Sequence, residues 1–346
     1  MGAYICTISE RDWGLARQLG MYGNRFYKTE NGKALKDTQK LSIIRDIISV
    51  KEGDIIFFHI RGRKTIHGVY RARSYAFWDD TRIWDDPHDV FPCRFLFEPH
   101  PNHEKLCLYD AHISVHSLYE LIDQGEIKSL VTLEFEQNIE ARAVRRIFME
   151  DAKKIIRLLY RDFKGGEKVD FDLYNPSNME PLKDKVYRVG DLENAIKAVI
   201  SWKLAYRDSE IVKLLELGEQ YDFVNEFFVA PTTRKNIDLF CESSDKYIII
   251  EVKKDICNRD ALEQALYYAD LVDQRPWSNK SFKKLVVLVG KRFDEDVKDK
   301  IKYINKINNT KVKLLKYVPI NNGTWARLNE VRLGGGTYVQ RTLFQD

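Results

Sequence analysis

The sequence predicts a protein of two domains: an α/β C-terminal domain with a mixed central sheet, and a mostly β N-terminal domain. Short apolar runs separated by turns fill the first part of the chain, which is typical of β structure. In the last part, runs such as YIIIEV and LVVLVG are separated by helical patterns, as expected for strands buried on both faces. A chain of 346 residues, 44% of them hydrophobic, is long enough to bury a core in each domain.

The N-terminal domain is expected to span residues 1–135. Alternating or continuous apolar residues predict its strands, at 4–8, 55–60 and 65–73. Two short helices are predicted at 42–50 and 117–123. Four prolines argue against a long helix after the strands, namely Pro87, Pro92, Pro99 and Pro101. We therefore expect a curved or closed sheet with helices at its margins.

Residues 136–190 are predicted to connect the two domains. Steps of three and four between apolar residues indicate a helix over 139–163, whose buried face is formed by Val144, Phe148, Ala152, Ile155 and Leu159. Residues 140–164 carry eight Lys or Arg and four Asp or Glu, and this +4 equals the net charge of the whole chain. The helix is either a solvated connection or a basic rod along a phosphate backbone. Gly-Gly, Asn-Pro and Glu-Pro then predict a linker over 164–190.

The C-terminal domain is expected to span residues 191–346, including a C-terminal tail. A helix is predicted to begin at Asp191, with Leu192, Ala195, Ile196 and Val199 on one face. Strands are predicted at 223–230, 236–241, 247–252, 284–289 and 311–318. Two further helices are predicted, at 259–272 and 294–307.

The segment NIDLFCESSDKYIIIEVKK, residues 236–254, carries the strongest chemical signal. Side chains alternate along a strand, so Glu251 and Lys253 point to the same face. The polar turn ESSDK predicts a hairpin that places Asp238 beside them. Burying three charges is costly without compensation, and a hard divalent cation would provide it. Carboxylates, the backbone carbonyl of Val252 and waters would suit Mg²⁺, while Lys253 would position or help deprotonate a water. A plain salt bridge on a hairpin edge is the alternative.

The pattern D-x(12)-E-V-K resembles the PD-(D/E)XK nuclease superfamily over residues 190–320, closest to its RecB-like and NucS-like branch. The resemblance assigns Asp238, Glu251 and Lys253 to the catalytic triad, although Ile237 stands where a proline is expected. Gln264 and Tyr268 match a Q-x-x-x-Y pattern and lie on one helix face. The resemblance also implies an acidic residue on the first helix of the fold. Glu193 is the best candidate, and its rivals are Glu210, Glu216 and Glu226.

Residues 51–74 resemble the hairpin of PUA-like domains, in particular the EVE and YTH group. The resemblance implies an aromatic pocket that holds an extruded or single-stranded base. Stacking on aromatic rings contributes about 1–3 kcal/mol per base. Candidate base-binding residues are Trp13, Asn24, Arg25, Tyr75, Trp78 and Trp84. The alternative is that the tryptophans belong to the core.

Composition indicates a soluble cytoplasmic protein. Five widely spaced cysteines without a C-x-x-C pair fit a reducing compartment. No apolar run approaches the roughly 18 residues of a membrane span. The Cys/His-rich stretch from Cys93 to His116 matches no standard zinc spacing, so no structural zinc is predicted.

These observations predict a Mg²⁺-dependent endodeoxyribonuclease, in which Mn²⁺ would substitute. Restriction, including modification-dependent restriction, is the expected setting, with the N-terminal domain selecting a site on double-stranded DNA. One alternative is a NucS-like repair endonuclease on mismatched or branched DNA, and another is a non-catalytic nucleic-acid-binding protein. PUA-like domains also read RNA, so an RNA target stays open. Two cuts in a duplex need two active sites, which favours a homodimer.

Overall fold

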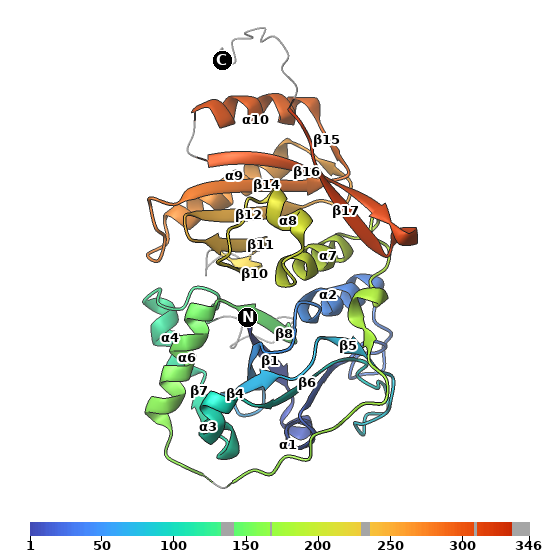
Figure 1. Ribbon diagram of the computed structural model, residues 1–346, viewed down its shortest axis with the longest axis vertical. Helices are drawn as coiled ribbons and strands as arrows, with labels where there is room; N and C mark the ends of the chain where they lie inside the picture. Colours follow the sequence, from blue (N-terminus) through green and yellow to red (C-terminus); the bar gives the residue numbers. More distant parts are fainter. Residues whose placement is uncertain (133–141, 167, 230–235, 308–309, 334–346) are drawn as a thin grey trace.

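The computed structural model describes residues 1–132, 142–166, 168–229, 236–307 and 310–333. The chain is a mixed α/β protein with one large sheet in each half (Figure 1). Four predicted features fall outside the described residues: the domain edge at 135–136, the start of the helix at 139, Ala230 and the C-terminal tail. None of the described helices has the length and apolar character that crossing a membrane requires.

The N-terminal sheet has nine strands, in the order β8-β1-β3-β4-β6-β5-β9, with β2 paired to β6 and β7 to β4. Strands β1 and β3 run parallel and the other pairs are antiparallel, so the sheet is mixed. The predicted strands at 4–8, 55–60 and 65–73 are confirmed within one residue at either end. The elements of this half are β1 Ala3–Ile8, α1 Glu10–Leu19, β2 Met21–Asn24, α2 Asp37–Ile47, β3 Ile55–Ile60, β4 Thr65–Ala72, β5 Phe77–Trp78, β6 Cys93–Pro99, α3 Glu104–Leu108, β7 His112–Ser114, α4 His116–Asp123, β8 Val144–Ile147, α6 Met149–Asp162 and β9 Glu180–Pro181.

The single long helix predicted over 139–163 is wrong in its first part. Val144 lies on β8, which pairs antiparallel with β1, and the helix α6 begins only at Met149. Phe148 has extended backbone at the helix cap, so the spacing of four between Val144 and Phe148 spans a strand and a cap. Arg145 and Arg146 are buried, so they do not belong to a basic outer face. Two of the positive charges counted in this segment therefore lie in the protein interior.

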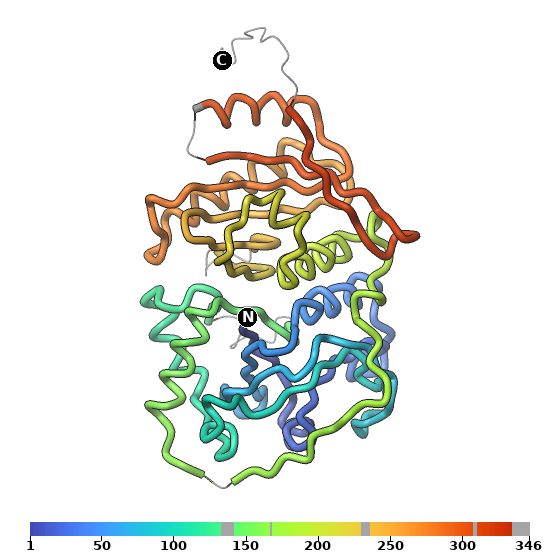
Figure 2. The backbone as a smooth tube through the Cα atoms, in the orientation of Figure 1, coloured from blue at the N-terminus to red at the C-terminus, as the bar shows by residue number. Residues whose placement is uncertain are grey.

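The predicted linker runs along the outer edge of the N-terminal half before the chain enters α7 (Figure 2). The backbone N–H of Tyr174 donates to the carbonyl of Leu19 at 2.8 Å, and that of Asp172 donates to Gln18 at 2.8 Å. Its short strand β9 pairs with β5 at the edge of the sheet. Most of the segment lacks regular structure, as predicted, but it is tied to α1 and to the sheet.

The C-terminal sheet has six strands in the order β10-β11-β12-β14-β16-β17. Strands β12, β14 and β16 run parallel, and β10, β11 and β17 are antiparallel to their neighbours. This confirms a mixed central sheet, to which the structure adds α8 and β17, two elements that the sequence did not predict. The elements are α7 Glu193–Ala205, α8 Ser209–Leu214, β10 Tyr221–Phe228, β11 Asn236–Ser243, β12 Lys246–Val252, β13 Ile256–Cys257, α9 Arg259–Asp273, β14 Lys283–Gly290, β15 Arg292–Phe293, α10 Glu295–Ile307, β16 Thr310–Ile320 and β17 Trp325–Glu330.

Helices cover both faces of this sheet, which explains the continuous apolar runs. Ile248 and Ile250 point to one face, where they join the core that includes α7 and α8. Ile249, between them, points to the opposite face and packs with α9 and α10. The first of these cores extends into the N-terminal half, because α2 packs directly against α7 (Figure 1).

Arg146 links the two sheets. Its guanidinium donates to the Phe223 carbonyl at 2.8 Å, to Asp222 at 3.1 Å and to the Tyr4 hydroxyl at 2.6 Å. We expect Arg146→Met to lower the free energy of unfolding by about 3–5 kcal/mol, because removing one partner of a buried ion pair leaves the other uncompensated. Urea-induced unfolding measures the change.

Arg161→Met on α6 is the matched control. Its side chain is exposed and, within the described part of the chain, pairs with the neighbouring Asp162 alone, so the substitution should change stability by no more than about 0.5 kcal/mol. Equal effects of the two substitutions would contradict the linking role of Arg146.

Candidate active site

Asp238 and Glu251 face each other across the hairpin of β11 and β12. The register pairs Leu239 with Ile250, and continuing it by one residue sets Asp238 opposite Glu251. Oδ2 of Asp238 accepts the backbone N–H of Val252 at 2.7 Å. The antiparallel hairpin predicted from the polar turn is therefore present, and it places two carboxylates at the end of an apolar sheet.

Glu251 is almost fully buried, at 2% exposure, and only half of its carboxylate is satisfied. Lys253 donates to Oε1 at 2.7 Å, whereas Oε2 has no hydrogen-bond partner among the described residues. Burial and the neighbouring charge of Asp238 raise the pKa of Glu251 to about 7. A buried acceptor without a partner is costly, so this oxygen is suited to a cation or a water.

Lys253 stands beside Glu251 as an ammonium. Burial opposes its charged form, but Glu251, Asp238 and Glu193 outweigh that effect and raise the pKa of Lys253. At neutral pH this group can donate hydrogen bonds and offset negative charge, but it is not free to accept a proton.

Lys197 on α7 occupies a place that the sequence did not reveal. Its ammonium forms an ion pair with Oδ1 of Asp238 and another with Oε1 of Glu226 at 3.2 Å. Burial opposes the charge of Lys197, but the two carboxylates outweigh it and raise its pKa. Both oxygens of Asp238 are thus engaged, one by Lys197 and one by the Val252 N–H.

Glu226 carries this network to the N-terminal half. Arg45 of α2 donates to its Oε1 at 2.6 Å, and Asn236 donates to its Oε2 at 3.2 Å. Burial opposes ionisation of Glu226, but Arg45 and Lys197 hold its pKa at about 2. Arg45 is itself buried and also bonds to Asp46. A continuous chain of ion pairs therefore runs from α2 to Asp238.

Of the four candidate acidic residues for the first helix, Glu193 lies on α7, at its first position. It is close enough to Lys253 to affect the pKa of that lysine. The rivals have other partners: Glu210 pairs with Lys203, Glu216 with Lys313, and Glu226 with Arg45 and Lys197. Glu226, on strand β10, is the rival nearest the carboxylate pair, through Lys197.

Gln264 and Tyr268 lie on one face of α9, as their spacing predicts. The amide of Gln264 donates to the Tyr268 hydroxyl at 2.8 Å. Tyr268 is buried, and burial together with the charges of Glu251 and Asp238 raises its pKa, against the hydrogen bond from Gln264. The pair is therefore within electrostatic reach of the two carboxylates.

The ligand atoms available at this site are of the type that a hard divalent cation prefers. Asp238, Glu251 and Glu193 offer carboxylate oxygens, and no described residue bonds to Oε2 of Glu251. The contribution of the Val252 carbonyl stays a prediction. Among the described residues, the one group of three His, Cys, Asp or Glu donors within 4.8 Å lies elsewhere, at His67, Asp110 and His112. Binding a metal at Asp238 therefore requires Lys197 to yield a carboxylate oxygen.

The six residues predicted to bind a base are spread over the N-terminal half. Trp13 and Trp78 lie in the core shared by both halves, and Trp84 packs against Phe91 in a separate cluster. Their burial matches the core alternative that the sequence left open. None of the six lines the pocket bounded by Gly14, Arg17 and Phe171, or the pocket bounded by Arg188, Lys254 and Arg292.

Each polar member of this set has at least one partner, although the side-chain amide nitrogen of Asn24 has none among the described residues. Asn24 accepts a hydrogen bond from the Tyr22 hydroxyl at 3.0 Å, and Arg25 pairs with Asp86. Tyr75, partly exposed, donates to the carbonyl of Met179 at 3.2 Å. Base binding by these residues stays a prediction.

A polar pocket of about 620 Å³ is lined by residues that are close in the sequence to Lys253 and Glu193. It contains four cationic and two acidic side chains together with one glycine, namely Arg188, Lys254, Lys291, Arg292, Asp191, Asp255 and Gly190. Lys254 directly follows Lys253 in the chain, and Asp191 lies two residues before Glu193. No sequence pattern indicates this pocket, because its residues come from three separate segments.

Comparisons with known proteins show no family. No protein-family model and no curated protein matches the chain. A hypothetical protein from Leishmania major aligns at 11% identity over 46% of this chain and 96% of its own, with a TM-score of 0.31. A protein from Pseudomonas putida aligns at 14% identity over 45% of this chain and 99% of its own, with a TM-score of 0.28. Scores this low carry no conclusion about fold or function.

The buried carboxylate of Glu251 should destabilise the metal-free protein at high pH. Its folded-state pKa of about 7 exceeds the usual 4.5, so the wild type loses stability as the pH rises through this window. In EDTA, the free energy of unfolding of the Glu251→Gln variant should therefore exceed that of the wild type by about 1–3 kcal/mol at about pH 8. Near pH 4.5 the two free energies should be similar. Chemical unfolding at both pH values measures this.

The control is Glu330→Gln, an exposed carboxylate at the end of β17, which should shift stability by no more than about 0.5 kcal/mol at either pH. A Glu251→Gln variant that is less stable than the wild type at the higher pH would show that the ionised Glu251 carboxylate does not destabilise the fold.

Proposed function

We propose that this protein is a Mg²⁺-dependent DNA endonuclease of the PD-(D/E)XK type that hydrolyses phosphodiester bonds. The observation that carries the proposal is the placement of Asp238 opposite Glu251 at the end of the hairpin. Lys253 bonds to Oε1 of Glu251, and Oε2 has no partner in the described part of the chain. Two buried carboxylates and an ammonium at one sheet end match the requirements of metal-assisted phosphoryl chemistry.

Asp238 and Glu251 would hold the ion, with Glu193 and the Val252 carbonyl as further donors. When bound, Mg²⁺ would acidify a water and offset charge on the phosphate. Lys253, as a charged group, would orient that water and stabilise negative charge that develops beside Glu251. Tyr268, held by Gln264, would border the site on the side of α9.

The basic pocket supports a polyanionic substrate. Its four cations outnumber its two acids, and two of its residues, Lys254 and Asp191, are close in the sequence to Lys253 and Glu193. Arg292 is engaged with Asp255, and Arg188 with Asp37 and Asp191. Lys254 and Lys291 are exposed and enter no ion pair among the described residues, so they are available to phosphates.

The rest of the proposal concerns the biological process in which the nuclease would act, how it would select a site and its oligomeric state. Restriction, including modification-dependent restriction, would use the N-terminal half to select the site, as the PUA-like hairpin at 51–74 implies. Because Trp13, Trp78 and Trp84 are buried, a base pocket there would draw on other exposed groups or on a local rearrangement. A homodimer would supply the two active sites that a double-strand cut needs.

One observation favours a non-catalytic nucleic-acid-binding protein as the second candidate. Lys197 already neutralises Asp238, so the site can be balanced without a metal. The two candidates differ in their dependence on divalent cations, since a purely binding protein needs none.

Asp238→Asn and Glu251→Gln should each abolish cleavage and leave DNA binding largely intact, because the metal-binding oxygens are lost while the surface cations stay. Glu193→Gln should reduce cleavage less, as an outer ligand. Plasmid cleavage with Mg²⁺, with Mn²⁺ and with EDTA measures the effect, and a filter-binding assay measures affinity.

Glu216→Gln is the matched control, since its carboxylate pairs with Lys313 away from the site. Full activity in the Asp238 or Glu251 variant, or undiminished activity in EDTA, would overturn the proposed reaction and favour the binding protein.

Lys254→Gln and Lys291→Gln should weaken DNA binding to a similar extent on all sequences. Each substitution should lower the slope of log affinity against log salt concentration by about 1, because one phosphate contact is lost. Lys302→Gln on α10, whose side chain pairs with Asp299, should leave the slope unchanged. Equal slopes in all variants would show that the basic pocket does not contact the DNA phosphates.

A further inference from the structure

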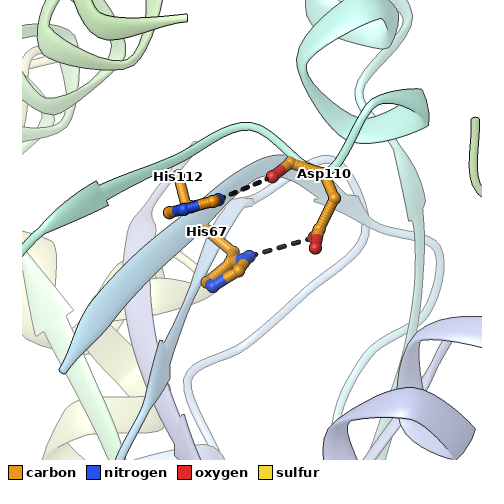
Figure 3. Close-up of side chains that lie close together, drawn as sticks. All are labelled: His67, Asp110 and His112. Carbon is orange, nitrogen blue, oxygen red and sulfur yellow. Dashed lines mark hydrogen bonds and ion pairs between the residues drawn. The ribbon is translucent and has the colours of Figure 1, made fainter. Parts of the chain in front are cut away.

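A second group of potential metal ligands lies in the N-terminal half, far along the chain from the carboxylate pair. His67 on β4 pairs directly with His112 on β7, and Asp110 precedes β7 (Figure 3). Donor atoms from the three side chains all lie within 4.8 Å of one another. Residues directly opposite in an antiparallel pair share a face, so the register itself brings the two imidazoles together.

Hydrogen bonds already orient two of these side chains. Nδ1 of His67 lies 3.0 Å from Oδ1 of Asp110, and its Nε2 lies 2.8 Å from the Thr65 hydroxyl. Arg17 of α1 pairs with the same Asp110 carboxylate at 2.7 Å. A partner on the second ring nitrogen and a partner on the carboxylate are the outer contacts that metal ligands in proteins usually have.

The protonation states suit metal binding. His67 is buried, and burial lowers its pKa despite its hydrogen bond to the Asp110 carboxylate, which favours the neutral imidazole. Burial opposes ionisation of Asp110, but His67 and Arg17 outweigh it and hold the pKa of Asp110 at about 2. A neutral imidazole and an ionised carboxylate are the forms that bind metals.

We propose that His67, Asp110 and His112 form a binding site for a divalent transition metal of the Zn²⁺ class. Two imidazoles and one carboxylate favour such ions over Mg²⁺. The metal would take the place between Nδ1 of His67 and the Asp110 carboxylate. The ring proton of His67 would then reside on Nε2, where the Thr65 hydroxyl accepts it, so the imidazole stays neutral.

The exposed His112 completes the site. Its ring stacks on His67 with centroids 4.8 Å apart, and its Nδ1 bonds to the backbone carbonyl of Asp110 at 3.0 Å. His67 and Asp110 already lie 3.0 Å apart, so metal–ligand bonds of about 2.0–2.2 Å require mainly that a ring nitrogen of His112 move closer to them. A rotation of the exposed His112 side chain supplies that movement, and water fills the position that faces solvent.

The site is independent of the proposed nuclease reaction, and Co²⁺ is the probe that separates the two. We would titrate Co²⁺ into the full-length Asp238→Asn/Glu251→Gln variant in excess Mg²⁺, so that the oxygen-only site is disabled. Visible absorption should show one bound Co²⁺ in nitrogen and oxygen coordination. Zn²⁺ should displace it and should raise the thermal stability of the same protein.

Adding His112→Ala should weaken Co²⁺ binding at least tenfold and abolish the stabilisation by Zn²⁺. His112 is exposed, so this variant should fold, and Asp110→Asn provides a second test of the same kind. His116→Ala, an exposed histidine just beyond β7, is the control and should bind as before. No Co²⁺ absorption, or equal binding with and without His112, would overturn the site.

Discussion

The ion pair between Lys197 and Asp238 is the interaction on which the C-terminal half depends. Asp238 lies opposite Glu251 in the interior, and two carboxylates so close repel each other unless a cation is present. Lys197 supplies that cation, and it is held in turn by Glu226 and Arg45. Because a broken buried pair leaves an uncompensated charge, these four side chains fix the position of α7 against β11, and of α2 against α7.

This arrangement joins the two halves of the molecule through charge as well as through apolar packing. The core around α2 and α7 is continuous across them, and Arg146 adds a second polar link between β8 and β10. A change in the N-terminal half can therefore reach Asp238 through Arg45 and Glu226 without a new contact. A protein that selects a site with one half and cuts with the other would need a connection of this kind.

Local patterns predicted much of the C-terminal half and little of what surrounds the site. The alternation of YIIIEVK predicted that Glu251 and Lys253 share a face, and the i,i+4 spacing predicted the same of Gln264 and Tyr268. In the structure each pair is joined by a hydrogen bond. Spacing misled at Val144 and Phe148, since four-residue steps fit a helix as well as a strand followed by a cap. Lys197, Arg45 and His67 carried no signal. The partners that draw them into these networks are Glu226 for Lys197 and Arg45, and Asp110 for His67; they lie 29 or more residues away, so only the tertiary fold brings them together.

A crystal structure of the full-length protein with Mn²⁺, phased to locate the metal by its anomalous signal, would show whether the two carboxylates bind a metal. We expect a peak between Asp238 and Glu251, with Oε2 of Glu251 bound to the ion and the Lys197 ammonium moved off Asp238. This expectation would be contradicted by a map without anomalous signal at these carboxylates, and with Lys197 still paired to Asp238, at a Mn²⁺ concentration that supports DNA cleavage.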